Sequence, residues 1–394
     1  MGILSLLGAN PAKTQEVPLN SATPYTDLRS LENNEIVHIS TGVKVNLDQM
    51  IDVVSESRVI YIGETHDNLE AHRAQLEVIQ KLTAIYPGQV AVGMEMFRRS
   101  AQTDLNRWQR GELSDRDFRI LFRKNWGAGY STYQPIFKYL KSQSIPLLGL
   151  KSSRETEALF KNAGANAEPG IFPEMDETDI HHKAHSMAIF GGHQDHSKAL
   201  EKPYQMLVLW EESMAQTVAE FLQNESYRGW KLVVLAGGFH VQYGFGIPKR
   251  AFRRTPHSYS IILPTVTEIP EELKDREMDV PYVPIPLPSA DFAWKLEYKI
   301  AGKDRVRLGV MLSRENGGEE IRITSVSPNS IAQKAGIRDG DIFLRMDGES
   351  LENVDELIDR LQMKKYGDTV SIGLLRGTEE IVLMVPLTKE EIKN

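Results

Sequence analysis

Residues 59–68, with the sequence VIYIGETHDN, set the arrangement of the rest of the chain. The first four residues are apolar and do not alternate with polar ones, which predicts a strand buried on both faces of a parallel sheet. Gly63 then ends the strand. Asp67, followed three residues later by Glu70, fits a capping box, so we expect a helix to begin there and to run to residues 87–88.

Glu64 and His66 therefore lie at the carboxyl end of a strand, where open α/β sheets bind ligands. A carboxylate and an imidazole two residues apart can hold a metal ion or act as acid and base, or they can simply complete a polar turn. Two further apolar segments, in residues 90–95 and 232–240, also end in glycine followed by Glu or His. If these strands are parallel neighbours, four side chains share one rim of the sheet: Glu64, His66, Glu95 and His240.

Composition bounds the remaining possibilities. The chain has 394 residues, of which 41% are hydrophobic and 25% charged, as in an ordinary globular protein with room for two domains. The balance of 46 basic and 54 acidic residues gives a net charge of -8, which argues against nucleic acid as the main partner. The sequence contains no cysteine, which excludes disulfides, thiolate metal sites and a cysteine nucleophile.

The residues around this rim resemble a known family, the ChaN-like haem-binding proteins of the Tiki and TraB superfamily. Four motifs of that family occur in its order: G-E-x-H-D-N at residues 63–68, G-x-E-M-F at 93–97, W-[DE]-E-x-M-A at 210–215 and G-x-x-H at 237–240. The resemblance spans about residues 35–266. It implies an α/β domain with a mainly parallel sheet flanked by helices, and haem or another planar ligand as its partner.

For haem, the resemblance and the residue chemistry together suggest several ligands. Tyr130 and Tyr133 follow a glycine-rich turn, so we expect a phenol exposed at a loop tip, and a tyrosinate can ligate ferric haem. Five of the ten histidines lie between residues 181 and 196, in a segment that forms either a solvated flap or a mobile lid presenting imidazole. The candidate haem-binding residues are His66, His240, Tyr130, Tyr133, His185 and His193.

The alternative function is metal-dependent hydrolysis, which the resemblance implies for relatives in the superfamily. Glu64, His66, Glu95 and His240 are the candidate catalytic residues, and with Glu211 they could hold Mn²⁺, Co²⁺ or Zn²⁺. Glu211 falls on the apolar stripe of a helix that Pro203 opens, so it must be paired, protonated or bound to a cation. Its neighbour Glu212 is expected to point away.

The C-terminal part has short predicted strands separated by glycine turns, and resembles a bacterial PDZ domain of the HtrA type. The resemblance places a carboxylate-binding loop at residues 308–311 and a groove-lining helix at residues 353–362. A peptide would add a strand beside residues 310–313, and the alternative is that the linker fills this groove. The peptide-binding candidates are Leu308, Gly309, Val310, Met311, Leu357 and Leu361.

The predicted organisation is an N-terminal extension at residues 1–34, the α/β domain at 35–266, a proline-rich linker at 267–298 and the small β-rich PDZ domain at 299–390. Residues 258–263 are expected to form the last strand of the first sheet. The N-terminal residues have an apolar patch too short to span a membrane and lack a basic region before it. The family resemblance implies the cell envelope or periplasm and leaves open a homodimer and membrane attachment through a removed leader.

Overall fold

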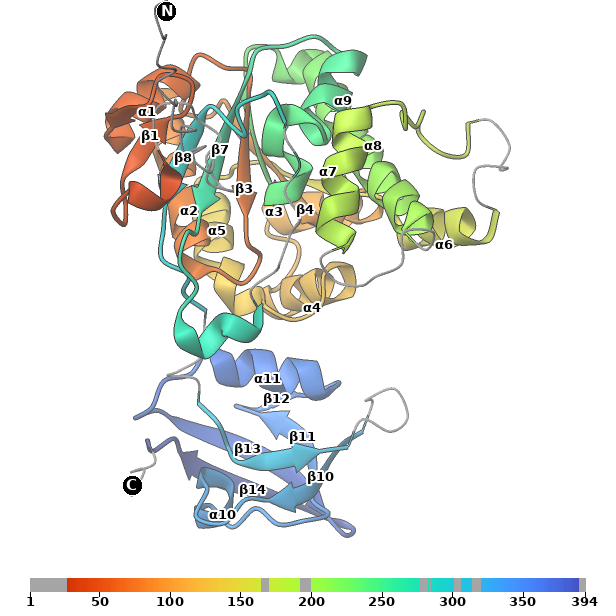
Figure 1. The fold of residues 1–394 in the computed structure, drawn as a ribbon. Coiled ribbons are helices and arrows are strands. Elements are labelled where there is room, and N and C mark those ends of the chain that lie inside the picture. The colour runs from red at the N-terminus through yellow and green to blue at the C-terminus, as the bar shows by residue number, and fades with distance from the viewer. Residues whose placement is uncertain are drawn as a thin grey trace, which may run out of the picture.

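The computed structural model describes residues 27–163, 170–191, 200–276, 283, 285–300, 306–313 and 320–389. They form an α/β domain followed by a smaller β-rich domain, coloured blue in Figure 1. This architecture confirms the fold class expected from the sequence. In the described part of the chain, no helix combines the length and apolar character needed to cross a bilayer.

The α/β domain is built on an eight-stranded sheet within the described residues, with the order β2-β1-β8-β7-β3-β6-β4-β5. Strands β8, β7, β3, β6, β4 and β5 pair in parallel, and β1 and β2 extend the sheet in antiparallel fashion. The three strands predicted to be neighbours therefore lie side by side. The strands are β1 (Ile36–His38), β2 (Val43–Val45), β3 (Val59–Glu64), β4 (Val90–Arg98), β5 (Leu147–Lys151), β6 (Lys231–Gly237), β7 (Tyr259–Thr265) and β8 (Phe292–Lys295).

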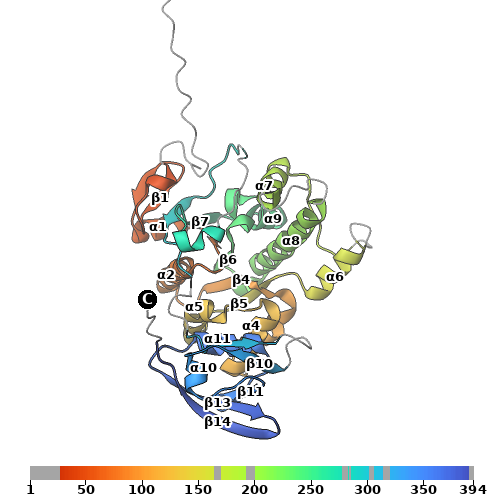
Figure 2. The same ribbon diagram turned by 60° about the horizontal axis from the view of Figure 1, so that its bottom comes forward.

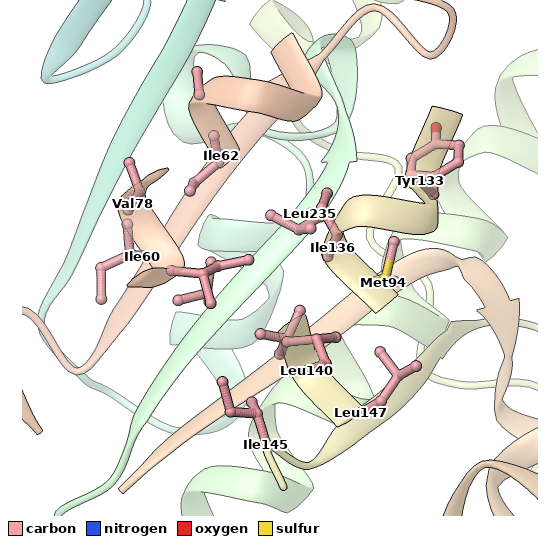
Figure 3. Close-up of a cluster of buried hydrophobic side chains, with 14 of the residues drawn as sticks. Ile60, Ile62, Val78, Met94, Tyr133, Ile136, Leu140, Ile145, Leu147 and Leu235 are labelled. Carbon is pink, nitrogen blue, oxygen red and sulfur yellow. The ribbon is translucent and has the colours of Figure 1, made fainter. Parts of the chain in front are cut away.

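Helices cover both faces of this sheet because alternate strand residues point to opposite sides. Ile60 and Ile62 of β3 join one hydrophobic core with residues of α1 to α5, whereas Val59 and Tyr61 join a second core with residues of α8 and α9. Figure 3 shows part of the first core, with Tyr133 at its edge. The helices are α1 (Leu47–Val54), α2 (Leu69–Ile85), α3 (Gln102–Gln109), α4 (Asp115–Asn125), α5 (Tyr130–Ser142), α6 (Arg154–Ala163), α7 (Ile180–Gly191), α8 (Glu201–Gln223) and α9 (Ile247–Arg254).

Three sequence expectations about this domain's boundaries are wrong. The capping residue of α2 is Asn68, whose side chain accepts from the Glu70 amide, so the helix begins one position later than a cap at Asp67 requires. β7 is not the last strand, because the chain returns after the proline-rich segment and adds β8 beside it. Residues 292–295, assigned to the linker, are therefore part of the first sheet.

The second domain is a six-stranded antiparallel sheet in the described residues, with two helices. Strand β9 lies at one edge of it and pairs with β10. Helix α11 begins directly after its capping residue Asn353, at the place expected for the groove-lining helix. The elements are β9 (Val310–Leu312), β10 (Ile321–Val326), α10 (Ile331–Lys334), β11 (Ile342–Met346), β12 (Glu349–Ser350), α11 (Val354–Gln362), β13 (Thr369–Arg376) and β14 (Glu379–Pro386).

The two domains touch. Helix α11 lies against α4 and α5 of the α/β domain, an arrangement visible in both ribbon views (Figures 1 and 2). Met363, just after α11, packs on the first hydrophobic core of the α/β domain. The connection is therefore more than a proline-rich tether.

Candidate functional site

The carboxyl ends of β3, β4 and β6 bring together the four rim residues predicted from the sequence. Glu64 stands opposite Gly237 in the β3–β6 register, and Glu95 belongs to the adjacent β4. His66 Nδ1 lies 2.7 Å from Glu64 Oε1, and its Nε2 lies 4.0 Å from Glu95 Oε2. His240 Nε2 lies 3.5 Å from the other oxygen of Glu95. We refer to Glu64, His66, Glu95 and His240 as the rim cluster.

Glu64 is buried and held by three neighbours besides His66. Tyr133 donates its hydroxyl to Glu64 at 2.5 Å, Gln75 donates its amide at 2.7 Å, and His72 Nε2 lies 3.6 Å away. Burial by itself would raise the pKa of Glu64, but the nearby His72 and His66 rings outweigh it and hold the pKa well below its usual range. Glu64 is therefore a fixed negative charge behind His66.

Glu95 is a second fixed charge. It accepts hydrogen bonds from the backbone N–H of Gly237 at 2.9 Å and from the Lys151 ammonium group at 3.3 Å. Burial opposes its ionisation, yet the His240, His66 and Lys151 charges keep its pKa well below the usual value. Burial would lower the pKa of His240, but Glu95 and Glu211 together raise it to about 9. His66 has a raised pKa for the same reason, since its contacts with Glu64 and Glu95 outweigh burial.

Glu211 extends the rim cluster inward. It is fully buried on α8, with Oε1 3.2 Å from His240 Nδ1 and Oε2 3.2 Å from Arg250 Nε. Its pKa lies well below the usual value, because His182, His240 and Arg250 outweigh burial. The sequence placed Glu211 correctly on a core-facing stripe. It is both next to the site and paired with an arginine.

Glu212 was expected to point away from the core, and this was wrong. It is as fully buried as Glu211 and binds Arg250, Arg253 and Arg254, at 3.2 Å for Arg253 and 2.6 Å for Arg254. Helix α9 packs along α8 and brings these arginines with it. A single-helix pattern cannot show that both faces of α8 will be covered.

Sequence reasoning missed several residues of the site. His182, on α7, lies 3.0 Å from Glu211 and is buried, whereas its neighbour His181 is exposed. The spacing of His182, Ser186 and Ile189 puts them on one face of a helix, and this is the sequence signal that could have singled out His182; the structure buries all three. His72, Gln75 and Lys151 have no local motif, because they are ordinary polar residues until packing places them beside Glu64 and Glu95.

The two tyrosines are not exposed at a loop tip, so that expectation is wrong. Tyr130 is the first residue of α5, and Tyr133 lies one turn further on; both are buried in the first core. Burial raises the pKa of Tyr130 to about 12, and burial together with the nearby Glu64 charge raises that of Tyr133 well above its usual value. Both phenols therefore stay protonated at neutral pH, and the Tyr133 hydroxyl donates its hydrogen bond to Glu64.

Helix α7 carries the described part of the histidine-rich segment. His185 is half-buried beside Phe239 and Tyr243, with ring centroids 6.2 Å and 5.2 Å away. Burial lowers its pKa to about 4, so the ring is neutral at physiological pH. His193 lies outside the described residues.

A divalent-metal centre finds no support in the geometry. Across the described ranges, no three His, Asp or Glu side chains are arranged to hold one metal ion. The carboxylates that would serve are already bonded, Glu64 to Tyr133 and Gln75, and Glu95 to Gly237 and Lys151. A metal would have to displace these donors.

In the second domain, the predicted peptide-binding residues divide into two groups. Leu308, Leu357 and Leu361 are buried in that domain's hydrophobic core. On the edge strand β9, Val310 is half-buried and Met311 is 66% exposed. Gly309 has φ of +78°, and a Cβ there would lie 2.3 Å from that of Ser330, so only glycine fits this loop.

Comparisons with known proteins match both domains to known families. Residues 50–251, about half of the chain, match the family described as haem-binding uptake, Tiki superfamily, ChaN. The structure of ChaN of Campylobacter jejuni, solved with cofacial haem binding, is similar in fold: the TM-score is 0.51 with 18% identity, over 67% of this chain and 98% of that one.

Residues 306–387 match the PDZ domain family. The curated relatives share this domain. The Do-like serine protease HtrA of Lactobacillus helveticus is 36% identical over 83 residues, and that of Bacillus subtilis is 30% identical over 130 residues. These matches cover 21% and 32% of this chain, but only 19% and 27% of the proteases' own length. The chain therefore belongs to the ChaN haem-binding uptake family of the Tiki superfamily, and carries a PDZ domain after its family domain.

Proposed function

We propose that this protein binds haem non-covalently at the rim cluster, with His66 as the residue that ligates the iron. The observation that carries this proposal is the orientation of His66. Its Nδ1 bonds to buried Glu64 at 2.7 Å, its Nε2 keeps a longer distance of 4.0 Å from Glu95, and 40% of the side chain is exposed, so Nε2 is the nitrogen available to a ligand. A carboxylate behind an imidazole fixes the ring and increases its basicity, as in many iron and zinc sites.

The surroundings of His66 fit a flat apolar ligand. The Trp126 ring packs 4.8 Å from the His66 ring, and Phe239, which precedes His240, is 44% exposed. Haem sites need such apolar surface together with a few polar groups. Bound haem would supply the iron, and this chain's residues would hold it and orient the imidazole.

The other candidate ligands are less suited. Both nitrogens of His240 lie close to carboxylates, at 3.2 Å and 3.5 Å, and only 10% of its side chain is exposed, against 40% for His66. The buried phenols of Tyr130 and Tyr133 keep their protons. His185, neutral and next to Phe239, is the best candidate for a second ligand.

A hemin titration followed by absorbance tests this assignment. The wild type should show a saturable Soret shift, and His66→Ala should weaken binding at least tenfold. Gly237→Ala adds a Cβ 3.0 Å from His66 Nε2 and should also weaken it, whereas Gly238→Ala, whose new Cβ finds no neighbour closer than 3.7 Å, should not. An unchanged spectrum with the wild type at micromolar hemin would sink the proposal, and metal-dependent hydrolysis would become the leading alternative.

For the PDZ domain we propose recognition of a free protein carboxyl terminus between β9 and α11. Edge strand β9 offers its backbone for strand addition, and the Gly309 loop stands at its start. Fluorescence polarisation with a labelled peptide ending in valine should give saturable binding to the full chain. The same peptide with an amidated terminus is the control, and equal binding of both would contradict carboxylate recognition.

Together these activities suggest haem uptake or sequestration in the cell envelope, with the PDZ domain recruiting a partner. The family of the first domain and the HtrA relatives of the second support this setting. Fractionation of cells that express the native gene would test the location. Recovery with the cytoplasmic fraction would contradict it.

A further inference from the structure

We propose that docking of the PDZ domain on α4 and α5 controls the affinity of the His66 site for its ligand. This inference rests on the proposed haem binding. Three separate contacts connect the second domain, or the chain that leads into it, with residues that hold His66.

The first contact runs through α5. Ser131 donates to Gln362 of α11 at 3.1 Å, and Gln134 approaches the Met363 sulfur at 3.5 Å. Tyr133, between these two positions, donates to Glu64, the carboxylate that orients His66. A shift of α5 would therefore reach the His66 ring through two hydrogen bonds.

The second contact runs through α4. This helix ends at Asn125, and the next residue, Trp126, packs on His66. On the same helix, Arg116 and Arg119 reach acidic side chains of the PDZ domain. Arg116 lies 3.2 Å from Glu352, and Arg119 lies 3.4 Å from Glu349.

The third contact is made by the chain that leads into the PDZ domain. The Leu69 amide donates to the Lys299 carbonyl at 2.7 Å, the Lys299 amide donates to Asn68 at 3.0 Å, and Tyr298 donates to Asp67 at 2.9 Å. Asp67 and Asn68 belong to the turn that follows His66 and caps α2. The turn that follows His66 is thus hydrogen-bonded to Tyr298 and Lys299, which precede the second domain in the chain.

The interface is charged, which makes docking adjustable rather than permanent. Besides the pairs on Arg116 and Arg119, Arg123 Nε lies 3.6 Å from Asp359, and both side chains are largely buried. Burying charges costs desolvation, so ion pairs of this kind add specificity and salt sensitivity more than net affinity. Small shifts of α11 can therefore favour or oppose docking.

Helix α11 belongs to both interfaces. Leu357 and Leu361 face the core of the PDZ domain, on the side of α11 where the proposed peptide groove would lie, while Glu356 and Asp359 face the arginines of α4. A peptide bound in this proposed groove would contact α11, the same helix that packs against α4 and α5. By linkage, any change that the peptide makes in ligand affinity must be matched by an equal change that the ligand makes in peptide affinity.

The test compares the full chain with two charge-reversed variants. Arg116→Glu with Arg119→Glu breaks the interface, and Arg107→Glu with Arg110→Glu is the matched control, because these arginines pair within their own surface region. Small-angle scattering should show separated domains only in the first variant. Hemin titration should then give affinity at least fivefold weaker in the first variant and unchanged in the control.

Hydrogen exchange provides a readout that does not require hemin. The turn at residues 63–69 should exchange faster in the interface variant, because the Leu69 amide loses a firmly held acceptor. If wild type fails to bind hemin but the turn still loosens, the proposed function fails and the structural coupling stands. Separated domains with unchanged exchange at the turn and unchanged hemin affinity would overturn the inference.

A peptide titration completes the experiment. The valine-terminated peptide should change the hemin affinity of wild type at least threefold and leave that of the interface variant unchanged. The same shift in both proteins would mean that the peptide acts on the α/β domain directly, and would contradict coupling through the docked PDZ domain.

Discussion

At the scale of single residues, the site depends on the hydrogen bonds that buried Glu64 accepts. Tyr133→Phe removes its hydroxyl donor and leaves one carboxylate oxygen with less support. We expect the free energy of unfolding to fall by about 1 to 3 kcal/mol, the range for losing a hydrogen bond to a buried charged group. Urea unfolding followed by tryptophan fluorescence measures this, since all five tryptophans lie before residue 300. Tyr139→Phe, on the same helix, should change little; an equal loss in both variants would argue against a specific bond.

His240 makes stability depend on pH. Its pKa is about 9 in the folded protein, above its ordinary value of 6.5, so folding favours the protonated ring. That stabilisation is complete below about pH 6.5 and is lost as the pH rises through about 9. It amounts to about 3 kcal/mol or less. Melting temperatures between pH 7 and 10 should fall less steeply for His240→Gln than for wild type or the exposed control His181→Gln. Parallel slopes in all three would refute this assignment.

At the scale of secondary structure, Gly246, the residue just before α9, is closely packed against the site. A Cβ at Gly246 would lie 2.3 Å from the His240 carbonyl oxygen and 2.8 Å from Glu211. Gly246→Ala should therefore displace α9 or the His240 turn and destabilise the α/β domain by about 1 to 3 kcal/mol. Gly238→Ala, whose Cβ would make only an ordinary contact 3.7 Å from the Glu64 carbonyl oxygen, is the control in urea unfolding. If Gly246→Ala is as stable as the wild type, the turn before α9 can move without a measurable cost, and the prediction is wrong.

At the scale of the whole molecule, the charged interface predicts a response to salt. The pairs on Arg116 and Arg119 are partly exposed, so ions screen them, with a screening length of about 10 Å at 0.1 M and about 3 Å at 1 M. The radius of gyration from scattering should increase as salt is raised over this range. The variant with both arginines reversed should already be extended and show no further increase. A wild-type radius independent of salt would mean that apolar contacts such as Met363 dominate docking.

The features that could be predicted from the amino-acid sequence are local or repeated. The unbroken apolar run before Gly63 identified a buried strand, and recurrence of glycine followed by Glu or His at two other strand ends identified the rim cluster. The order of family motifs and of PDZ landmarks identified both domains. These features are legible because strand burial and turn chemistry depend on neighbours a few residues away.

The surroundings of those residues became known only from the folded chain. Tyr133, Gln75 and His72 reach Glu64 because α2 and α5 pack on the sheet, and Glu212 is buried because α9 covers the face of α8 that a lone helix would expose to water. The addition of β8 after the prolines and the docking of α11 on α4 likewise join segments far apart in the chain. The partners of a buried charge are chosen by packing between distant elements, and no periodicity within one element records that choice.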